Sequence, residues 1–177
     1  MGVSTAVDTA RVEAWTFDVD DRLTRLFDTH HRRLFLLARR LSGSHEEARD
    51  LVQETFLRIA RRPGAALPTD AAGELAWLMR TTINLCHDQR RRRAVRVRHL
   101  ASSPPPAHAD SPEEQYVAGV AVWQALNGLD ARRRAIVVLH EIDGESVEWI
   151  AKTLGIAPVT VRWHLARARR VLARILG

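Results

Sequence analysis

Polar and aromatic side chains recur along one side of the C-terminal segment, at positions where they can contact nucleic acid. They are Thr160, Arg162, Trp163, Arg167 and Arg170. Arginine guanidinium groups and threonine hydroxyls hydrogen bond to base edges and phosphates. This set predicts DNA binding rather than catalysis, provided that one helix presents these side chains together.

Two short helices joined by a tight turn are expected to position this set. Apolar residues fall at helical spacing on both sides of Gly155, whose backbone freedom suits a sharp turn. They are Val147, Ile150, Ala151 and Leu154 before the turn, and Val161, Leu165, Ala168 and Leu172 after it. Pro158 suits the first turn of the second helix, where its missing N–H is not needed. The pattern is typical of a helix-turn-helix that enters a major groove, although a helical hairpin in a bundle gives similar spacing.

Charge is unevenly distributed along the 177 residues, which carry a formal net charge of +6. Residues 21–100 carry +8 and residues 127–177 carry +4, whereas residues 1–20 and 101–126 each carry −3. Two basic blocks separated by an acidic spacer predict two modules that bind a polyanion. Almost all the basic residues are arginines, a preference that a GC-rich genome would also produce.

The N-terminal half predicts three helices. The first spans residues 21–42 with an apolar stripe that includes Phe27, and it ends at Ser42-Gly43. Ser44 is expected to cap the second helix, which reaches about Arg61 and buries Ala48, Leu51, Val52, Thr55, Phe56 and Ile59. Residues 62–73 hold two prolines and two glycines and predict a loop, after which a third helix begins near Glu74 and ends in the run Arg90 to Arg93.

Three successive prolines interrupt the helical pattern in residues 101–112 and predict a linker. The pattern resumes at Glu113, breaks near Gly128, restarts with Asp130 as an N-cap and turns again at Asp143-Gly144. The expected fold is all-α, with two small helical domains joined by a flexible proline-rich linker. We expect a flexible N-terminal extension over residues 1–20, domains over 21–100 and 119–177, and the linker over 101–118.

Catalytic and metal-binding motifs are not apparent. The single Cys86 excludes an internal disulfide and predicts a packed small hydrophobe. The eight histidines show no ligand pattern such as H-E-x-x-H, and neither a glycine-rich phosphate loop nor a G-x-S-x-G motif occurs. We therefore expect no enzyme activity, cofactor or metal. Without a signal peptide or a long apolar run, we also expect a cytoplasmic protein with no membrane insertion.

The second predicted helix carries a resemblance to a known family. Residues 49–58, with the sequence RDLVQETFLR, resemble the core-binding helix of bacterial RNA polymerase sigma factors of the extracytoplasmic-function (ECF) type. The third helix, with Ala76-Trp77-Leu78, Asn84, Asp88 and the arginine run, resembles the family's promoter-melting and minus-10 helix. The C-terminal half resembles its minus-35-reading domain. One departure is Trp163-His164, where the family often has a small or polar residue.

The resemblance implies a non-enzymatic initiation factor that binds the polymerase core and positions it on promoter DNA. Implied partners are the beta and beta-prime subunits of the core, promoter DNA and an anti-sigma factor. The implied core-binding residues are Asp50, Gln53, Glu54 and Arg58. The implied minus-10 residues are Asn84, Asp88, Arg90, Arg91, Arg92 and Arg93. The implied minus-35 residues are Thr160, Arg162, Trp163 and Arg167. An aromatic residue within an Ala-Trp-Leu stripe is more often core than a stacking platform, so we expect Trp77 to be packed.

Two other classes of protein remain as alternatives. A one-component helix-turn-helix regulator would account for the C-terminal segment but leaves residues 50–58 unexplained. A nucleic-acid-processing enzyme could use Asp28, His30 and His31, but these residues lack a metal-ligand constellation. Direct association with polymerase core distinguishes the sigma-factor hypothesis from both.

Overall fold

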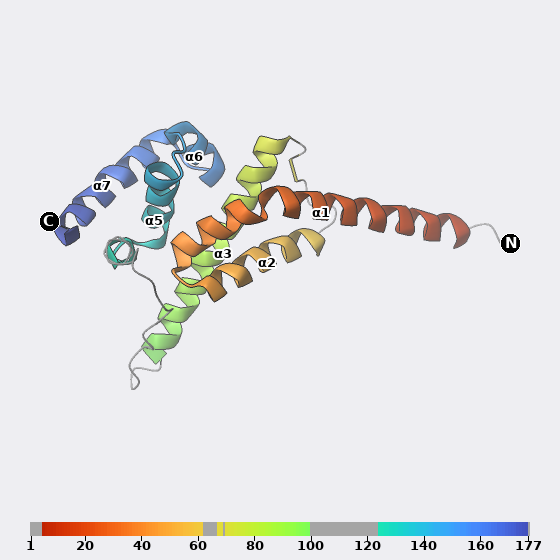
Figure 1. Ribbon diagram of the computed structural model, residues 1–177, viewed down its shortest axis with the longest axis horizontal. Coiled ribbons are helices and arrows are strands. Elements are labelled where there is room, and N and C mark those ends of the chain that lie inside the picture. The colour runs from red at the N-terminus through yellow and green to blue at the C-terminus, as the bar shows by residue number, and fades with distance from the viewer. Residues whose placement is uncertain (1–4, 62–66, 69, 100–123, 177) are drawn as a thin grey trace.

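Helices form all the regular structure that the chain shows over its described residues. The computed structural model describes residues 5–61, 67–68, 70–99 and 124–176. The elements are α1 (Thr5–Ser42), α2 (His45–Ala60), α3 (Ala71–His99), α5 (Ala131–Val137), the π-helical η1 (Val138–Ile142), α6 (Val147–Leu154) and α7 (Pro158–Leu176) (Figure 1). The predicted all-α class is confirmed. The predicted linker over residues 101–118 lies outside the described residues.

The corner between α1 and α2 forms as its sequence predicts. Gly43 adopts a positive φ of 84°, which ends α1, and the side chain of Ser44 accepts a hydrogen bond from the backbone N–H of Glu47 at 3.3 Å. The six buried residues of α2 are those predicted. At its other end, α1 extends back to Thr5 instead of starting at Asp21. The flexibility expected for residues 1–20 stays a prediction.

The third helix begins at Ala71, three residues before the predicted start at Glu74. Asp70 stabilises the first turn because its carboxylate accepts a hydrogen bond from the backbone N–H of Gly73 at 2.8 Å. Pro68 packs directly against Gly73, and a Cβ added at Gly73 would lie 2.5 Å from that of Pro68. Only glycine therefore fits this close approach of the loop to the helix.

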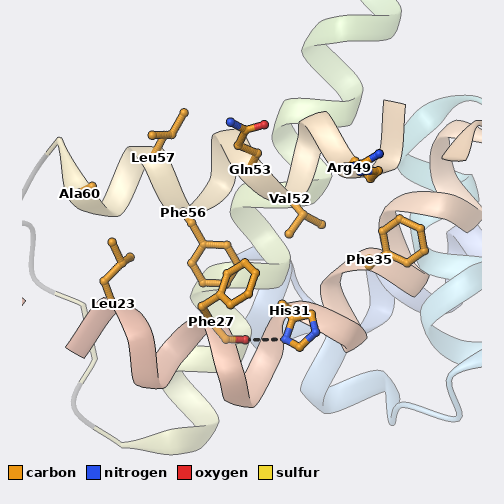
Figure 2. Close-up of a pocket in the computed structure, with 10 residues that line it drawn as sticks. All are labelled: Leu23, Phe27, His31, Phe35, Arg49, Val52, Gln53, Phe56, Leu57 and Ala60. Atoms are coloured by element: carbon orange, nitrogen blue, oxygen red, sulfur yellow. Dashed lines mark hydrogen bonds between the residues drawn. The ribbon is translucent and has the colours of Figure 1, made fainter. Parts of the chain in front are cut away.

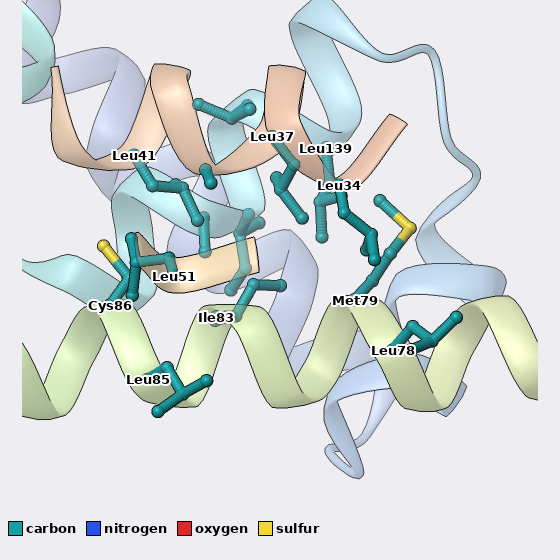
Figure 3. Packing of buried hydrophobic residues seen from close by; sticks show 14 of the residues in the cluster. Leu34, Leu37, Leu41, Leu51, Leu78, Met79, Ile83, Leu85, Cys86 and Leu139 are labelled. Atoms are coloured by element: carbon teal, nitrogen blue, oxygen red, sulfur yellow. The ribbon is translucent and has the colours of Figure 1, made fainter. Parts of the chain in front are cut away.

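Helices α1, α2 and α3 pack around one apolar core (Figure 3). Leu34, Leu37 and Leu78 are fully buried in it, and Cys86 is buried as predicted. Trp77 is partly buried and packs against the same core, as expected. Phe27 was expected in the apolar stripe of α1, but 44% of it remains exposed. The stripe is wider than the surface that α2 and α3 cover, so its edge stays in solvent.

The C-terminal helices confirm the predicted helix-turn-helix. Asp130 caps α5, with its carboxylate accepting from the backbone N–H of Arg133 at 3.0 Å. Gly155 ends α6 in the left-handed conformation, with φ of 67°. Helix α7 then starts at Pro158, and Val161, Leu165 and Ala168 are buried against the preceding helices.

The two halves of the chain are packed against each other in this structure. Leu139 of η1 belongs to the same buried cluster as the leucines of α1 (Figure 3). Arg40 of α1 pairs with Asp143, and Arg33 pairs with Glu145. Apolar burial and charge pairing together hold the helix-turn-helix half on the end of the three-helix half.

Candidate nucleic-acid interface

The residues predicted to read DNA lie on the N-terminal half of α7. Arg162, Trp163 and Arg167 are exposed there, and Thr160 is partly buried. Nη2 of Arg162 lies 2.8 Å from Oε1 of Glu148 on α6, and both side chains are mostly solvent-exposed. An exposed pair of this kind is weak, so Arg162 can exchange Glu148 for a DNA acceptor at small cost.

Trp163 lies at the surface rather than packing back into the domain. Its side chain is 51% exposed. The guanidinium carbon of Arg133 lies 5.8 Å from the ring centroid and that of Arg167 lies 6.0 Å from it. His164 meets the ring edge-on at 4.9 Å between centroids, and burial lowers the pKa of His164 so that it favours the neutral form. The indole therefore forms an exposed aromatic platform between two cationic groups.

The residues predicted to bind polymerase core divide between two surfaces of α2. Asp50, Glu54 and Arg58, spaced four residues apart, line a cleft of about 450 Å³ between α2 and α3. Glu54 lies 3.6 Å from Arg58 and 3.7 Å from Arg61. Gln53 was expected with them but lies on the α1 side of the helix. The 100° rotation between successive residues of a helix explains the separation.

The predicted minus-10 residues of α3 are also divided. Asp88 and Arg92 line the cleft between α2 and α3, opposite Asp50 and Glu54. Asn84 is exposed and is not among the residues that line this cleft. Residues of the two predicted sites therefore meet in this cleft, which is lined by three carboxylates and two guanidinium groups.

The other three arginines of the run differ in their contacts. Nη1 of Arg90 approaches the backbone carbonyl of Leu41 at 3.5 Å, near the packing of the two halves. Nη2 of Arg91 lies 3.9 Å from the Asp88 carboxylate, and Nη1 of Arg93 lies 2.9 Å from that of Glu47. The run is therefore not one uniform basic surface.

An apolar groove between α1 and α2 was not predicted (Figure 2). Its volume is about 450 Å³. Phe27 stacks on His31 with 4.8 Å between ring centroids and tilts against Phe56 at 5.1 Å. The remaining lining residues are Leu23, Phe35, Arg49, Val52, Gln53, Leu57 and Ala60. The four-residue spacing of Phe27, His31 and Phe35 is the sequence signal that could have revealed it.

The described residues hold neither a cluster of metal ligands nor a membrane-spanning helix. No three histidine, cysteine, aspartate or glutamate side chains gather there as a metal site. None of the helices described is both long and apolar enough to cross a membrane.

Comparison with known proteins finds two family regions in the chain. Residues 26–96 match the Sigma-70 region 2 family and residues 119–172 match Sigma-70, region 4. The chain is 38% identical over 154 residues to the ECF RNA polymerase sigma factor SigM of Mycobacterium tuberculosis, covering 86% of this chain and 76% of SigM. It is 38% identical over 176 residues to SigE of Mycolicibacterium smegmatis, covering 96% of this chain and 64% of SigE.

Solved structures show the same fold. The sigma factor RpoE in complex with the anti-sigma factor NepR from Bartonella quintana superposes with a TM-score of 0.65 at 27% identity, covering 90% of this chain and 96% of RpoE. CnrH in complex with the cytosolic domain of CnrY gives a TM-score of 0.61 at 26% identity, covering 89% and 88% of the two chains.

Two matched regions in the order of a sigma factor define a transcription initiation factor, a class that is not enzymatic. The chain belongs to the family of ECF RNA polymerase sigma factors. Its function is promoter-specific initiation of transcription by RNA polymerase.

Proposed function

We propose that this sigma factor binds polymerase core and minus-10 DNA through one continuous surface, the cleft between α2 and α3. The observation that carries the proposal is the joint lining of this cleft by Asp50, Glu54 and Arg58 with Asp88 and Arg92. Carboxylates on α2 suit a basic helical partner in the core, whereas arginines on α3 suit the DNA backbone. Core and promoter would then be bound next to each other, as melting of the minus-10 element requires.

Gln53 extends the proposed core interface around α2 toward the apolar groove. Asn84 and Arg91 are exposed on α3, outside the cleft, and would contact the opened strand. Arg90 and Arg93 complete the proposed minus-10 set, although the first approaches Leu41 and the second pairs with Glu47. These two side chains would need to exchange their present contacts to reach DNA.

The minus-35 element is proposed to bind α7, with Thr160, Arg162, Trp163 and Arg167 in the major groove. Arg162, Trp163 and Arg167 are exposed on one side of the helix-turn-helix, and this exposure supports the role. The corresponding division of the chain is an extension over residues 1–20, a core-binding and minus-10 domain over 21–100, a linker over 101–118 and a minus-35 domain over 119–177.

An anti-sigma factor is a further proposed partner, because the structures of RpoE and CnrH are of sigma factors bound to such regulators. We also propose that the chain itself catalyses no reaction and acts in the cytoplasm, where polymerase and promoters are found. The beta and beta-prime subunits would form the core surface that it occupies.

The decisive experiment is run-off transcription with purified core and a library of genomic promoters. We expect transcripts from a subset of promoters only when the chain and core are combined, and co-purification of the two. A one-component regulator, the alternative function, would bind its operator without core and give no core-dependent transcripts. That result would overturn the function on which the proposed role of the cleft depends.

A further inference from the structure

The environment of Trp163 includes a cation from outside the recognition helix. Arg133 lies on α5, thirty positions earlier in the chain, yet its guanidinium carbon is as close to the indole centroid as that of Arg167. A guanidinium within about 6 Å of an aromatic face is attracted by the ring quadrupole. The exposed platform of α7 is therefore assembled from two helices.

Asp130 fixes the position of Arg133. Its Oδ2 lies 2.9 Å from Nη1 of Arg133, and its Oδ1 caps the backbone N–H of the same residue. The Arg133 side chain is only 23% exposed, so it has lost most of its freedom before any ligand arrives. One carboxylate engages part of a guanidinium that has five N–H donors. Nε is buried and has no hydrogen-bond partner, so a ligand from solvent would be met by the Nη groups.

The position of the Arg133 guanidinium beside α7 suits contact with the phosphates that border a major groove. The major groove is about 12 Å wide, close to the diameter of a helix with its side chains, and phosphates of both strands border it. With α7 in the groove, a cation on a neighbouring helix, beside an exposed residue of α7, would lie at the level of the groove wall. Phosphate oxygens there are the acceptors that a planar guanidinium binds best.

We propose that Arg133 is an additional promoter-binding residue, held by Trp163 and Asp130 so that its guanidinium contacts a backbone phosphate beside the minus-35 element. This role rests on the proposed docking of α7 in the major groove. Trp163 acts as a positioning residue in it, and its own contact with DNA is with the sugar-phosphate wall. The phosphate contact strengthens binding to all minus-35 sequences without choosing among them.

The test uses holoenzyme reconstituted from core and the full chain, bound to a duplex that wild-type holoenzyme has selected from a random promoter library. Affinity is measured at several salt concentrations. Arg133→Ala should lower the slope of log affinity against log salt by about 0.9, the contribution of one phosphate contact. The loss should be the same for single-base variants of the minus-35 element.

Three further variants separate positioning from general charge. Arg174→Ala removes an exposed cation from the last turn of α7, about three turns beyond Trp163, and should leave the slope unchanged. Arg133→Lys keeps the charge but loses the planar stack, so it should recover only part of the slope. With Trp163→Ala as background, Arg133→Ala should have a smaller effect than in the wild-type chain.

The outcomes also distinguish this role from the proposed function. A wild-type holoenzyme that selects no promoter would refute the function itself. A holoenzyme that selects a promoter, together with an Arg133→Ala variant that folds and keeps the wild-type slope, would refute only the role of Arg133. An equal loss of slope with Arg174→Ala would show that any cation on this domain suffices and would also overturn it.

Discussion

The guanidinium of Arg134 donates a hydrogen bond from Nη1 to the backbone carbonyl of Leu41 at 3.0 Å, and so joins the two halves of the chain. Its Nε donates to the carbonyl of Leu126 at 2.8 Å. The residue is 1% exposed, and burial, followed by repulsion from Arg90, lowers the pKa of Arg134 to about 10. Leu41 lies in the last turn of α1, where free carbonyls and the helix dipole favour a cation.

Replacement of this buried cation should destabilise the packed form. Arg134→Met keeps an unbranched side chain but removes two hydrogen bonds from a charged donor, and we expect a loss of about 2 kcal/mol in the free energy of unfolding. The Leu126 carbonyl then keeps only the backbone N–H of Leu129, and the Leu41 carbonyl keeps only the 3.5 Å approach of Arg90. Urea unfolding of the full chain measures it. Arg132→Met, at an exposed neighbouring position, should change stability by less than about 0.5 kcal/mol. Equal midpoints for the two variants would contradict the structural role.

Charge reversal in the cleft between α2 and α3 should weaken association with polymerase core. Glu54→Arg places a third cation beside Arg58 and Arg61, and we expect at least a tenfold loss of affinity, about 1.4 kcal/mol. Helical content should not change, because the Glu54 side chain is 38% exposed. Glu46→Arg, an exposed acid in the first turn of α2, is the control. Unfolding of the Glu54 variant would mean that this residue is structural.

Removal of Arg162 distinguishes two modes of DNA contact. If Arg162 binds a guanine with two hydrogen bonds, Arg162→Ala should cost about 1–3 kcal/mol and relax preference at one base pair. A phosphate contact would instead weaken binding to all sequences and lower the salt slope by about one. Holoenzyme affinity across minus-35 variants at two salt concentrations separates these results. Absence of either effect would place the DNA on another face of α7.

Stability should decrease on acidification because two histidines are held in their neutral forms. Burial lowers the pKa of His30, an effect that Glu74 opposes and Arg33 reinforces, and burial likewise lowers that of His164. Below a pH of about 6.5 the unfolded chain binds more protons than the folded chain, so the free energy of unfolding falls as pH falls. Urea unfolding at pH 7.5 and 5.5 measures this decrease.

Substitution of the histidines should reduce that dependence. The decrease should be smaller in His30→Gln and smaller again when His164→Gln is added, because each change removes a group that protonates more readily in the unfolded chain. A double variant with the same pH profile as the wild type would assign the dependence to other groups.

Local patterns in the sequence predicted much of the fold. The caps at Ser44 and Asp130, the turn at Gly155 and the buried stripe of α2 each depend on residues within a few positions of one another, and the structure confirms them. Arg134 shows where such reasoning ends. Its own helix gives an arginine no reason for burial, because one of the two carbonyls that bind it comes from α1, 93 positions away.

Predicted site residues also depended on contacts that sequence does not specify. The motif groups Asp50, Gln53 and Glu54 together. Only the packing of the helices shows that Asp50 and Glu54 line the cleft between α2 and α3, whereas Gln53 lines the apolar groove between α1 and α2. The spacing of Phe27 predicted a core position, but its side chain is exposed because α2 does not extend far enough over α1 to cover it. The sites predicted from the motif remain to be tested by the variants above.

The π-helical turn η1 and the residue that follows it contact two different helices, α7 and α1. The backbone N–H of Asp143 reaches the carbonyl of Val138, five positions back, so η1 turns less per residue than an α-helix. Glu141 consequently meets Arg169 of α7 at 2.8 Å, while Asp143 meets Arg40 of α1. The packing of the C-terminal half and its attachment to the other half therefore both depend on carboxylates in and beside the same wide turn.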